Sequence, residues 1–375
     1  MANYEESTHY NGEAIVRFYP GMHGYFVTDP ALNKKNARTG GGTSLTGTLN
    51  KGQGLMMWPM WEMSKYIKSY FESATLQDLI DDPDTTIETI LKAGRDAHVK
   101  KSDRGKSVGT DAHAWVESWC NYKMKGGEEP VVPEIEDIVK VLRTAYLRVV
   151  NDLKPKEIDE WKRLPKLIFK EIEIQEAMWT EASMVRRSII AAKEWLAMHD
   201  IIVHGAEDTV YSRKLFVCGK YDGDWSVTCS KKCNWCYRNG DSNALAQILA
   251  GPGEDFTFTG RYVTDFKSTN ASRDQPKGIY PEYLAQCAIY ETAIIEEFPD
   301  RKYDGYLLLN GSKQPATDKD GNEYPVFNTH FSFNNEQYRQ WASILAANKG
   351  FIKLAGEEMK KSNAGIKSTE KTTTK

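Results

Sequence analysis

The sequence predicts an α+β, or mixed α/β, protein, and the order of its patterns carries this prediction. Residues 43–200 are dominated by apolar positions at helical spacing, and residues 201–266 by short runs rich in β-branched and aromatic residues. Another helical pattern follows over 281–297, then an apolar strand over 306–309. Helices first, then a mostly antiparallel strand set, then a helix and a strand indicate a mixed β-sheet core with an N-terminal helical elaboration.

The helical part is expected to contain several separate helices. They are expected at residues 55–73, 85–101, 110–119, from about 133, and 181–199. Asp84 suits the N-cap of the second helix, and Pro133 suits the first turn of the fourth. The apolar segment 167–174 fits either a helix or a strand.

The strands are expected at residues 201–203, 209–211, 215–221, 256–258 and 262–266, and a closing helix at 336–347. Residues 1–42 are polar and Gly-rich, so we expect a flexible N-terminal segment. Residues 351–375 combine the end of the last helix with a disordered Lys/Thr-rich tail. One domain over 43–350 is expected, with a helical part to about 200 and a catalytic core over about 201–350.

Charge and hydropathy narrow the classes of function. A net charge of −3 and a pI near 6.2 give no global basic field, so nucleic-acid binding requires a local patch. No apolar run approaches the roughly 20 residues of a membrane helix, and the N-terminus lacks the pattern of a signal peptide. The expectation is a cytoplasmic protein without a membrane partner.

The stretch Asp265-Phe266-Lys267 is the strongest chemical signal. Residues two apart on a strand point to one face, so the carboxylate and the ammonium converge. The carboxylate can hold a divalent cation, and the ammonium can position a water or offset phosphate charge. Asp-x-Lys pairs also occur on many solvated strand faces. The residues around Asp265 and Lys267 therefore decide whether this pair is functional.

Asp222 supplies a second carboxylate at the end of an apolar strand. The alternative is a tight turn over Tyr221-Asp222-Gly223-Asp224, because Asp-Gly is a strong hairpin signal. Together with Asp265 and Lys267, however, Asp222 completes a hard-cation site of the kind that Mg²⁺ or Mn²⁺ accepts.

His113 and Glu117 fall on one face of a predicted helix. A polar helix face capped by Thr110 is the ordinary interpretation. The Gly-rich entry over 101–109 would leave the start of that helix open to an anion, which makes His113 a candidate ligand or phosphate contact.

Tyr283, Gln286 and Tyr290 form a stripe on the helix after the Asp265 strand. Core packing is the ordinary interpretation of such a stripe. A Gln within it needs polar partners, so the stripe is also suited to orient the Lys267 ammonium or a DNA phosphate.

A cysteine-containing insertion is expected between the two aspartates, which lie 43 positions apart. Within about 225–256, Cys229, Cys233 and Cys236 are spaced C-x3-C-x2-C, which fits a structural Zn²⁺ site or, less well, an Fe–S cluster. Cys218 and His204 are candidates for the fourth ligand. The chain lacks the alternating βα pattern of radical-SAM enzymes, which share this spacing. Basic residues in the insertion, able to contact a DNA backbone, are Lys231, Lys232 and Arg238.

In the order of these motifs the chain resembles the PD-(D/E)xK nuclease superfamily, in the branch of RecB-type domains and phage and mitochondrial-maintenance exonucleases. The segments that carry the resemblance are Thr43-Ser-Leu-Thr46 with Leu55 and Trp58, Gly109-Thr110 with His113, Trp195 through Glu207 with Val210-Tyr211, Gly219-x-x-Asp222, Asp265-Phe-Lys267-Ser-Thr269, and Tyr283 with Gln286 and Tyr290. The resemblance implies a restriction-endonuclease-like mixed sheet flanked by helices. The two metal-binding strands are usually closer in sequence, so the insertion departs from the pattern.

The resemblance also implies a role for each matched residue. Asp222 and Asp265 would bind Mg²⁺ or Mn²⁺ with His113 as an additional ligand, and Lys267 would orient or activate the water. Supporting roles fall to Gln286, Tyr290 and Glu207. Glu171 and Glu173 compete with Glu207 for the position of the accessory glutamate, on an equivalent strand.

The expected function is metal-dependent hydrolysis of DNA by an exonuclease, in recombination, replication or end processing, and plausibly phage-encoded. DNA with linear or single-stranded ends and a recombination or replication protein are the expected partners. A structure-specific endonuclease of the same fold and a catalytically inactive DNA-end-binding module are the alternatives.

Overall fold

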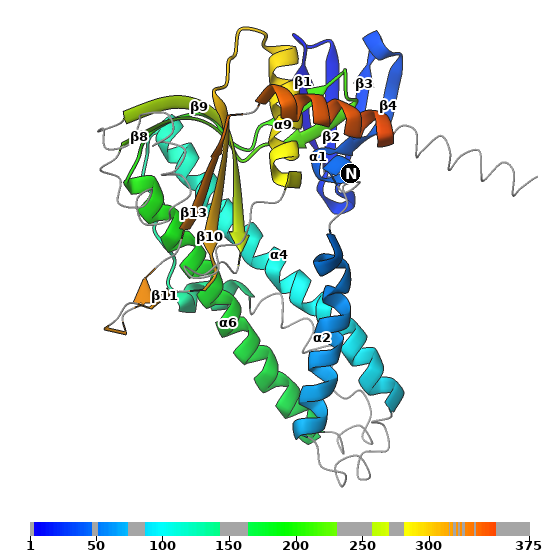
Figure 1. Cartoon of the computed structure of the whole chain (residues 1–375), viewed down its shortest axis with the longest axis vertical. Helices are drawn as coiled ribbons and strands as arrows, with labels where there is room; N and C mark the ends of the chain where they lie inside the picture. The colour runs from blue at the N-terminus through cyan, green and yellow to red at the C-terminus, as the bar shows by residue number, and fades with distance from the viewer. Residues whose placement is uncertain are drawn as a thin grey trace, which may run out of the picture.

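The chain folds into two mixed β-sheets with helices around them, and three long helices extend from the sheets as an arm (Figure 1). This computed structural model describes residues 4–46, 52–73, 87–142, 164–230, 257–269, 281–314, 316–317, 320–321, 323–324, 327–333 and 335–349. The mixed α/β class expected from the sequence is confirmed. No helix in these ranges has the length and apolar character needed to cross a membrane.

The five-stranded sheet has the order β13-β10-β9-β8-β5. Its strands are β5 (Asp200–Gly205), β8 (Gly223–Ser230), β9 (Thr257–Thr269), β10 (Gly305–Ser312) and β13 (Phe327–Ser332). The first three pair antiparallel, and the chain then crosses through helix α9 (Pro281–Glu297) to β10, which pairs parallel to β9. The two strands expected at 256–258 and 262–266 are one continuous strand, β9.

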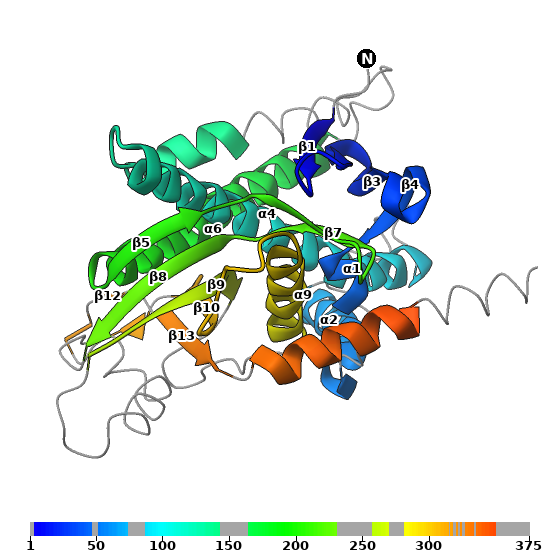
Figure 2. The same ribbon diagram turned by 90° about the horizontal axis from the view of Figure 1, so that it is seen from above.

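Helices cover both faces of this sheet, because the side chains of its strands alternate. Leu307 and Leu309 of β10 pack in one core cluster with the long helices, whereas Leu308 between them packs with α9. Figure 2 shows α9 on one side of the sheet and α4 and α6 on the other. All of β10 is buried as a result.

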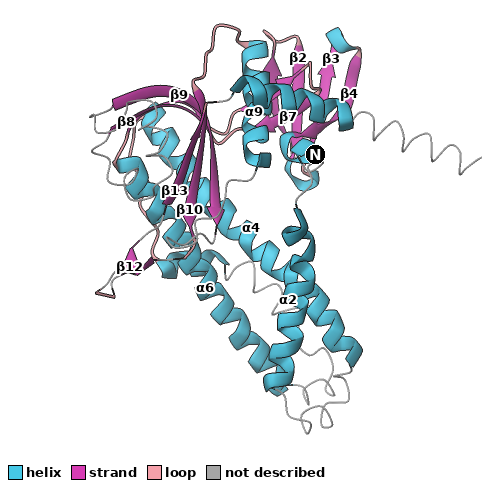
Figure 3. Ribbon diagram, viewed as in Figure 1, coloured by secondary structure: helices cyan, strands magenta, loops and turns pink. Residues whose placement is uncertain are grey.

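The arm consists of α2 (Gly52–Ser73), α4 (Ile87–Lys125) and α6 (Leu164–Ala197), coloured as helices in Figure 3. The two helices expected at 85–101 and 110–119 are a single helix, α4. An interior glycine costs a helix only about 1 kcal/mol, and the α4 residues Val108, Ala112 and Trp115 gain burial in the core. The expected helix start at Gly109, open to an anion, is therefore wrong: Gly109 lies inside α4.

Residues 167–174, for which the sequence allowed either a helix or a strand, belong to helix α6. Glu171 and Glu173 consequently lie on a helix, and the strand position considered for them is wrong. Shorter helices occupy residues 135–142 and 335–349, close to those expected from Pro133 and at 336–347.

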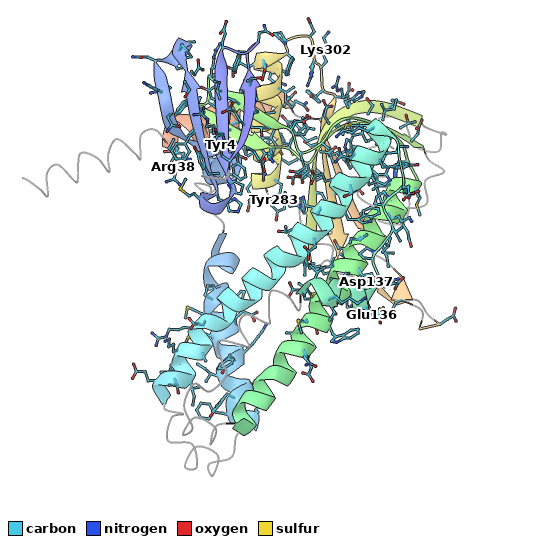
Figure 4. All side chains as sticks on the ribbon, turned by 180° about the vertical axis from the view of Figure 1, so that it is seen from behind. Tyr4, Arg38, Glu136, Asp137, Tyr283 and Lys302 are labelled. Atoms are coloured by element: carbon cyan, nitrogen blue, oxygen red, sulfur yellow. The ribbon has the colours of Figure 1, made fainter. Side chains whose placement is uncertain are left out.

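The prediction of a flexible segment at residues 1–42 is wrong, because most of these residues form a β-sheet. Four strands pair in order, and the last of them pairs parallel to β7. The elements of this N-terminal sheet are β1 (Glu5–His9), β2 (Ala14–Tyr19), β3 (Gly24–Asp29), β4 (Lys34–Gly41), β7 (Val217–Lys220) and β6 (Thr209–Ser212), with 3-10 turns η1 (Pro20–Met22) and η2 (Pro30–Leu32). Its inner face buries Ala14, Val16 and Val27 against Tyr211 and Cys218. Figure 4 labels Tyr4 and Arg38 in this part of the chain.

Polar contacts fix β1 to the end of α9. His9 is buried, and its Nδ1 lies 2.8 Å from Oε2 of Glu297, while its Nε2 lies 2.9 Å from the Ser7 hydroxyl. The backbone N–H of Tyr10 donates to Oε1 of the same glutamate at 2.9 Å. Both ring nitrogens of a buried histidine are thereby satisfied, so these contacts anchor the N-terminal sheet to the helix.

The chain passes from one sheet to the other at Tyr221 and Asp222. Strand β7 ends at Lys220, and β8 of the second sheet begins at Gly223. The tight turn considered over Tyr221–Asp224 is therefore absent, because Gly223 and Asp224 already pair with β9.

Asp222 and the cysteine insertion lie at opposite ends of the β8–β9 hairpin. Cys229 is not in a loop as expected: it belongs to β8 and pairs with Phe258, so the insertion begins later than residue 225. Seven residues of strand place it roughly 23 Å from Asp222. The expected insertion residues Cys233, Cys236, Lys231, Lys232 and Arg238 lie outside the described residues.

Cys218 does not fit a fourth ligand for that cluster. It is buried on β7 in the apolar core of the N-terminal sheet. His204, the other candidate, lies on β5, where its Nε2 is 2.7 Å from the Ser226 hydroxyl. The small hairpin of β11 (Ala316–Thr317) and β12 (Glu323–Tyr324) lies apart from these residues in sequence.

The close packing of Tyr290 predicts that Gly219→Ala destabilises the fold. A Cβ at Gly219 would run into the Tyr290 ring, whereas a Cβ at Gly21 would meet nothing within 4 Å. Overpacking of this kind costs about 1–3 kcal/mol. Urea unfolding should show that loss for Gly219→Ala and a change below about 0.5 kcal/mol for Gly21→Ala. Equal stability of the two variants would contradict the packing.

Candidate metal centre

Three side chains from distant parts of the sequence converge where the two sheets meet. Ligand atoms of His113, Glu207 and Asp222 all lie within 4.8 Å of one another, and each side chain is partly buried. They come from α4, from the connection between β5 and β6, and from the passage between β7 and β8. Two carboxylates and an imidazole suit Mg²⁺ or Mn²⁺, so the donor set fits a hard or borderline divalent cation.

The carboxylate of Asp222, which directly precedes β8, is held by the neighbouring strand β9. Its Oδ2 accepts a hydrogen bond of 2.6 Å from the backbone N–H of Phe266 and lies 3.4 Å from Nδ1 of His113. The His113 ring also packs edge-on against the Phe266 ring, with centroids 5.0 Å apart. One carboxylate therefore joins α4 to β9, with the donor atoms already pre-arranged for a cation.

Glu207 has an unusual backbone conformation. Its φ is 52°, in the left-handed region that residues other than glycine seldom adopt, and its N–H donates to the Tyr221 carbonyl at 2.9 Å. Backbone of this kind persists where the surrounding structure fixes it, and it often occurs at functional sites. The bond to Tyr221 places Glu207 beside the residue that precedes Asp222.

The electrostatics of the three groups favour a cation. Burial raises the pKa of Glu207 to about 7, and the charges of Asp222 and Glu117 add to that effect. Burial lowers the pKa of His113, although Asp222 opposes the change, so the imidazole is held in the neutral form that binds metals. Crowded carboxylates repel each other, and a divalent cation between them would remove that cost. Glu117, on the His113 face of α4, is an acidic neighbour that received no role from the sequence.

Asp265, which is buried, and Lys267, which is partly buried, form an ion pair on β9. Asp265 directly follows Thr264, the β9 partner of Gly223, and Asp222 directly precedes Gly223. Lys267 Nζ donates to Asp265 Oδ1 at 2.5 Å, and Asp265 is 1% exposed. Its Oδ2 has no hydrogen-bond partner in the described part of the chain. A buried carboxylate oxygen without a hydrogen-bond partner is costly, and such an oxygen is suited to bind a cation.

The charges of this pair are strongly coupled. Burial raises the pKa of Asp265 and the Lys267 ammonium opposes it. Burial also works against the charge of Lys267, but Asp265 and Asp222 outweigh it and raise the pKa of Lys267. The ammonium therefore stays protonated. Asp265 is not one of the three converging donors, and its role as a metal ligand stays a prediction.

The stripe of Tyr283, Gln286 and Tyr290 lies on helix α9, and its first residue contacts Lys267. Lys267 Nζ lies 5.2 Å from the centroid of the Tyr283 ring, a cation–π distance, and Figure 4 labels Tyr283. Gln286 Nε2 donates to the Tyr290 hydroxyl at 2.7 Å. Tyr290 itself is buried in the core, so the core interpretation holds for Tyr290, while Tyr283 contacts the charged pair.

No protein-family model and no curated protein matches the chain. The candidate centre therefore stands on the geometry of its residues.

The donor geometry predicts stabilisation by divalent cations that depends on Asp222. At a Mg²⁺ or Mn²⁺ concentration of 100 times the dissociation constant, the folded state should gain about 2.7 kcal/mol. Asp222→Asn keeps an acceptor for the Phe266 N–H but removes the charge, so it should lose most of that gain. Thermal unfolding with and without metal measures both.

The matched control is Asp137→Asn, at an exposed carboxylate paired with Lys140. It should keep the full metal-dependent shift. An Asp222→Asn protein that is stabilised by Mn²⁺ as strongly as the parent would refute the site.

Proposed function

We propose that this chain is a Mg²⁺-dependent DNA nuclease on a restriction-endonuclease-like core, acting as an exonuclease in recombination, replication or end processing. The observation that carries the proposal is the convergence of His113, Glu207 and Asp222 next to the Asp265–Lys267 ion pair. Acidic and imidazole donors beside a charged lysine suit phosphodiester hydrolysis better than they suit a purely structural site.

The topology supports the same proposal. Asp222 directly precedes β8, and Asp265 lies on the antiparallel neighbour β9 directly after Thr264, the partner of Gly223, so both aspartates lie at one end of the hairpin. Helix α9 then carries the Tyr283 side chain back to Lys267, and β10 continues the sheet in parallel. This matches the order of parts that the nuclease resemblance implies, with the insertion moved to the far end of the hairpin.

Each side chain has a defined task in hydrolysis. A bound Mg²⁺ would offset phosphate charge and lower the pKa of a water in its shell. His113, Glu207 and Asp222 would hold the cation, with Asp265 Oδ2 available as a further oxygen. Lys267 carries a fixed positive charge to a phosphate oxygen or to the attacking water. The water oxygen forms the new bond to phosphorus, the phosphorus–ester oxygen bond breaks, and the leaving oxygen takes a proton.

Removal of the Lys267 charge tests the chemistry directly. Lys267→Met should lower the Mg²⁺-dependent kcat on end-labelled linear DNA by about 10²- to 10³-fold, because one charge-stabilising donor is lost. The control is Lys302→Met, an exposed lysine after α9 that Figure 4 labels. Its rate should equal that of the parent. Equal rates for Lys267→Met and the parent would show that the mechanism is wrong.

The form of the substrate separates the three candidate functions. The exonuclease proposal predicts Mg²⁺-dependent degradation of linear DNA and no cleavage of closed circular DNA. Cleavage of both forms would support an endonuclease. Binding of DNA ends without turnover in Mg²⁺ or Mn²⁺ would support an inactive binding module.

A further inference from the structure

Two aromatic rings pair at the rim of the N-terminal sheet. Phe18 of β2 lies directly across from Tyr25 of β3, with ring centroids 4.7 Å apart and an angle of 32° between the ring planes. They continue the inward-facing series of Val16 and Val27, which are buried, yet both rings remain partly exposed. The sheet thus leaves part of each of two neighbouring aromatic rings open to solvent.

The ring pair lies next to the candidate metal centre. Lys220, the last residue of β7 and two positions before Asp222, places its Nζ 5.6 Å from the centroid of the Phe18 ring. Tyr25 lies within 3.7 Å of a Cβ built at Gly41, on the strand that pairs with β7. Burial raises the pKa of Tyr25, and the charges of Cys218 and Glu207 add to the rise.

The chemistry of this rim fits one nucleotide. Aromatic side chains stack with any base, and a lysine beside them can contact the attached phosphate. Lys220 now pairs with Glu5, but both side chains are partly exposed, and ion pairs of this kind contribute little. A phosphate can therefore replace Glu5. In a duplex both faces of a base are covered by its neighbours, so only an unpaired nucleotide offers a face to the rings.

We propose that Phe18, Tyr25 and Lys220 form a base-stacking subsite that binds an unpaired nucleotide beside the metal centre. The inference rests on the proposed nuclease function and names its substrate class: DNA with a single-stranded end. Strands β2, β3 and β7 of the N-terminal sheet thereby supply substrate selection beside a centre whose donors come from α4 and from the connections that flank β6 and β7.

The test compares variants on the two faces of one strand pair. Phe18→Ala should weaken binding of a fluorescent 12-nucleotide single strand about tenfold or more, as loss of one stacked base implies. Phe26→Ala is the matched control, because Phe26 of β3 points to the opposite face and contacts Tyr19. Its binding should stay within twofold of the parent. Fluorescence anisotropy in Ca²⁺, or without metal, measures binding in the absence of turnover.

Phe18→Leu is a second variant that controls for misfolding, because leucine keeps most of the apolar volume that packs against Tyr25. It should fold like the parent by circular dichroism and still lose several-fold in affinity for the single strand. A 12-base-pair blunt duplex should bind more weakly than the single strand and respond less to either Phe18 variant.

The outcomes separate the subsite from the nuclease. Equal single-strand binding by Phe18→Ala, Phe26→Ala and the parent, or no binding by the parent, would overturn the subsite. An equal loss on duplex and single strand would overturn its selectivity for unpaired bases. Hydrolysis of bis-p-nitrophenyl phosphate, which has no base, tests the nuclease separately. A parent protein that binds single strands through Phe18 but never cleaves this diester supports the subsite and refutes the nuclease.

Discussion

The structure depends on how the chain crosses between its two sheets at Tyr221 and Asp222. Asp222 ends the path from β7 and is held by the Phe266 N–H of β9, so its carboxylate lies where both sheets and α4 meet. The crossing also holds Glu207, whose N–H bonds to the Tyr221 carbonyl. Two acidic groups are thereby forced together with His113 in a partly buried place. Such crowding of acidic groups is unfavourable at a site that only supports the fold, and it is favourable where a cation binds between them.

The N-terminal sheet is part of this arrangement. Tyr290 of α9 packs against Gly219 of β7, and a Cβ at Gly42 would lie 3.0 Å from the same ring. Small residues at these two positions let α9 approach the N-terminal sheet closely, and Tyr283 of the same helix contacts Lys267. The His9–Glu297 contact fixes the other end of α9. Helix α9 therefore joins the strand that bears the charged pair to the sheet that bears the aromatic rim.

The sequence predicted the parts of the fold that depend on local pattern. The period of two placed Asp265 and Lys267 on one face, and helix α9 has the expected bounds, 281–297. The N-terminal sheet escaped prediction because its strands are short, and residues such as Tyr10, Asn11 and His23 turn the chain with positive φ. Two glycines suggested a boundary within α4, where long-range burial instead maintains the helix. The family resemblance named His113 and Asp222 as metal ligands together with Asp265, and it gave Glu207 only a supporting role. The convergence of Glu207 with His113 and Asp222 came from the structure, since residues so distant in sequence show no spacing of their own.

The central claim is that His113, Glu207 and Asp222 hold a divalent cation at the crossing between the sheets. Anomalous diffraction from crystals grown with Mn²⁺ tests it most directly. The account predicts a Mn²⁺ peak within bonding distance of a carboxylate oxygen of Asp222, with an imidazole nitrogen of His113 or a Glu207 oxygen completing the protein ligands. A map without a peak at this position, or with Mn²⁺ bound only elsewhere on the chain, would contradict the account.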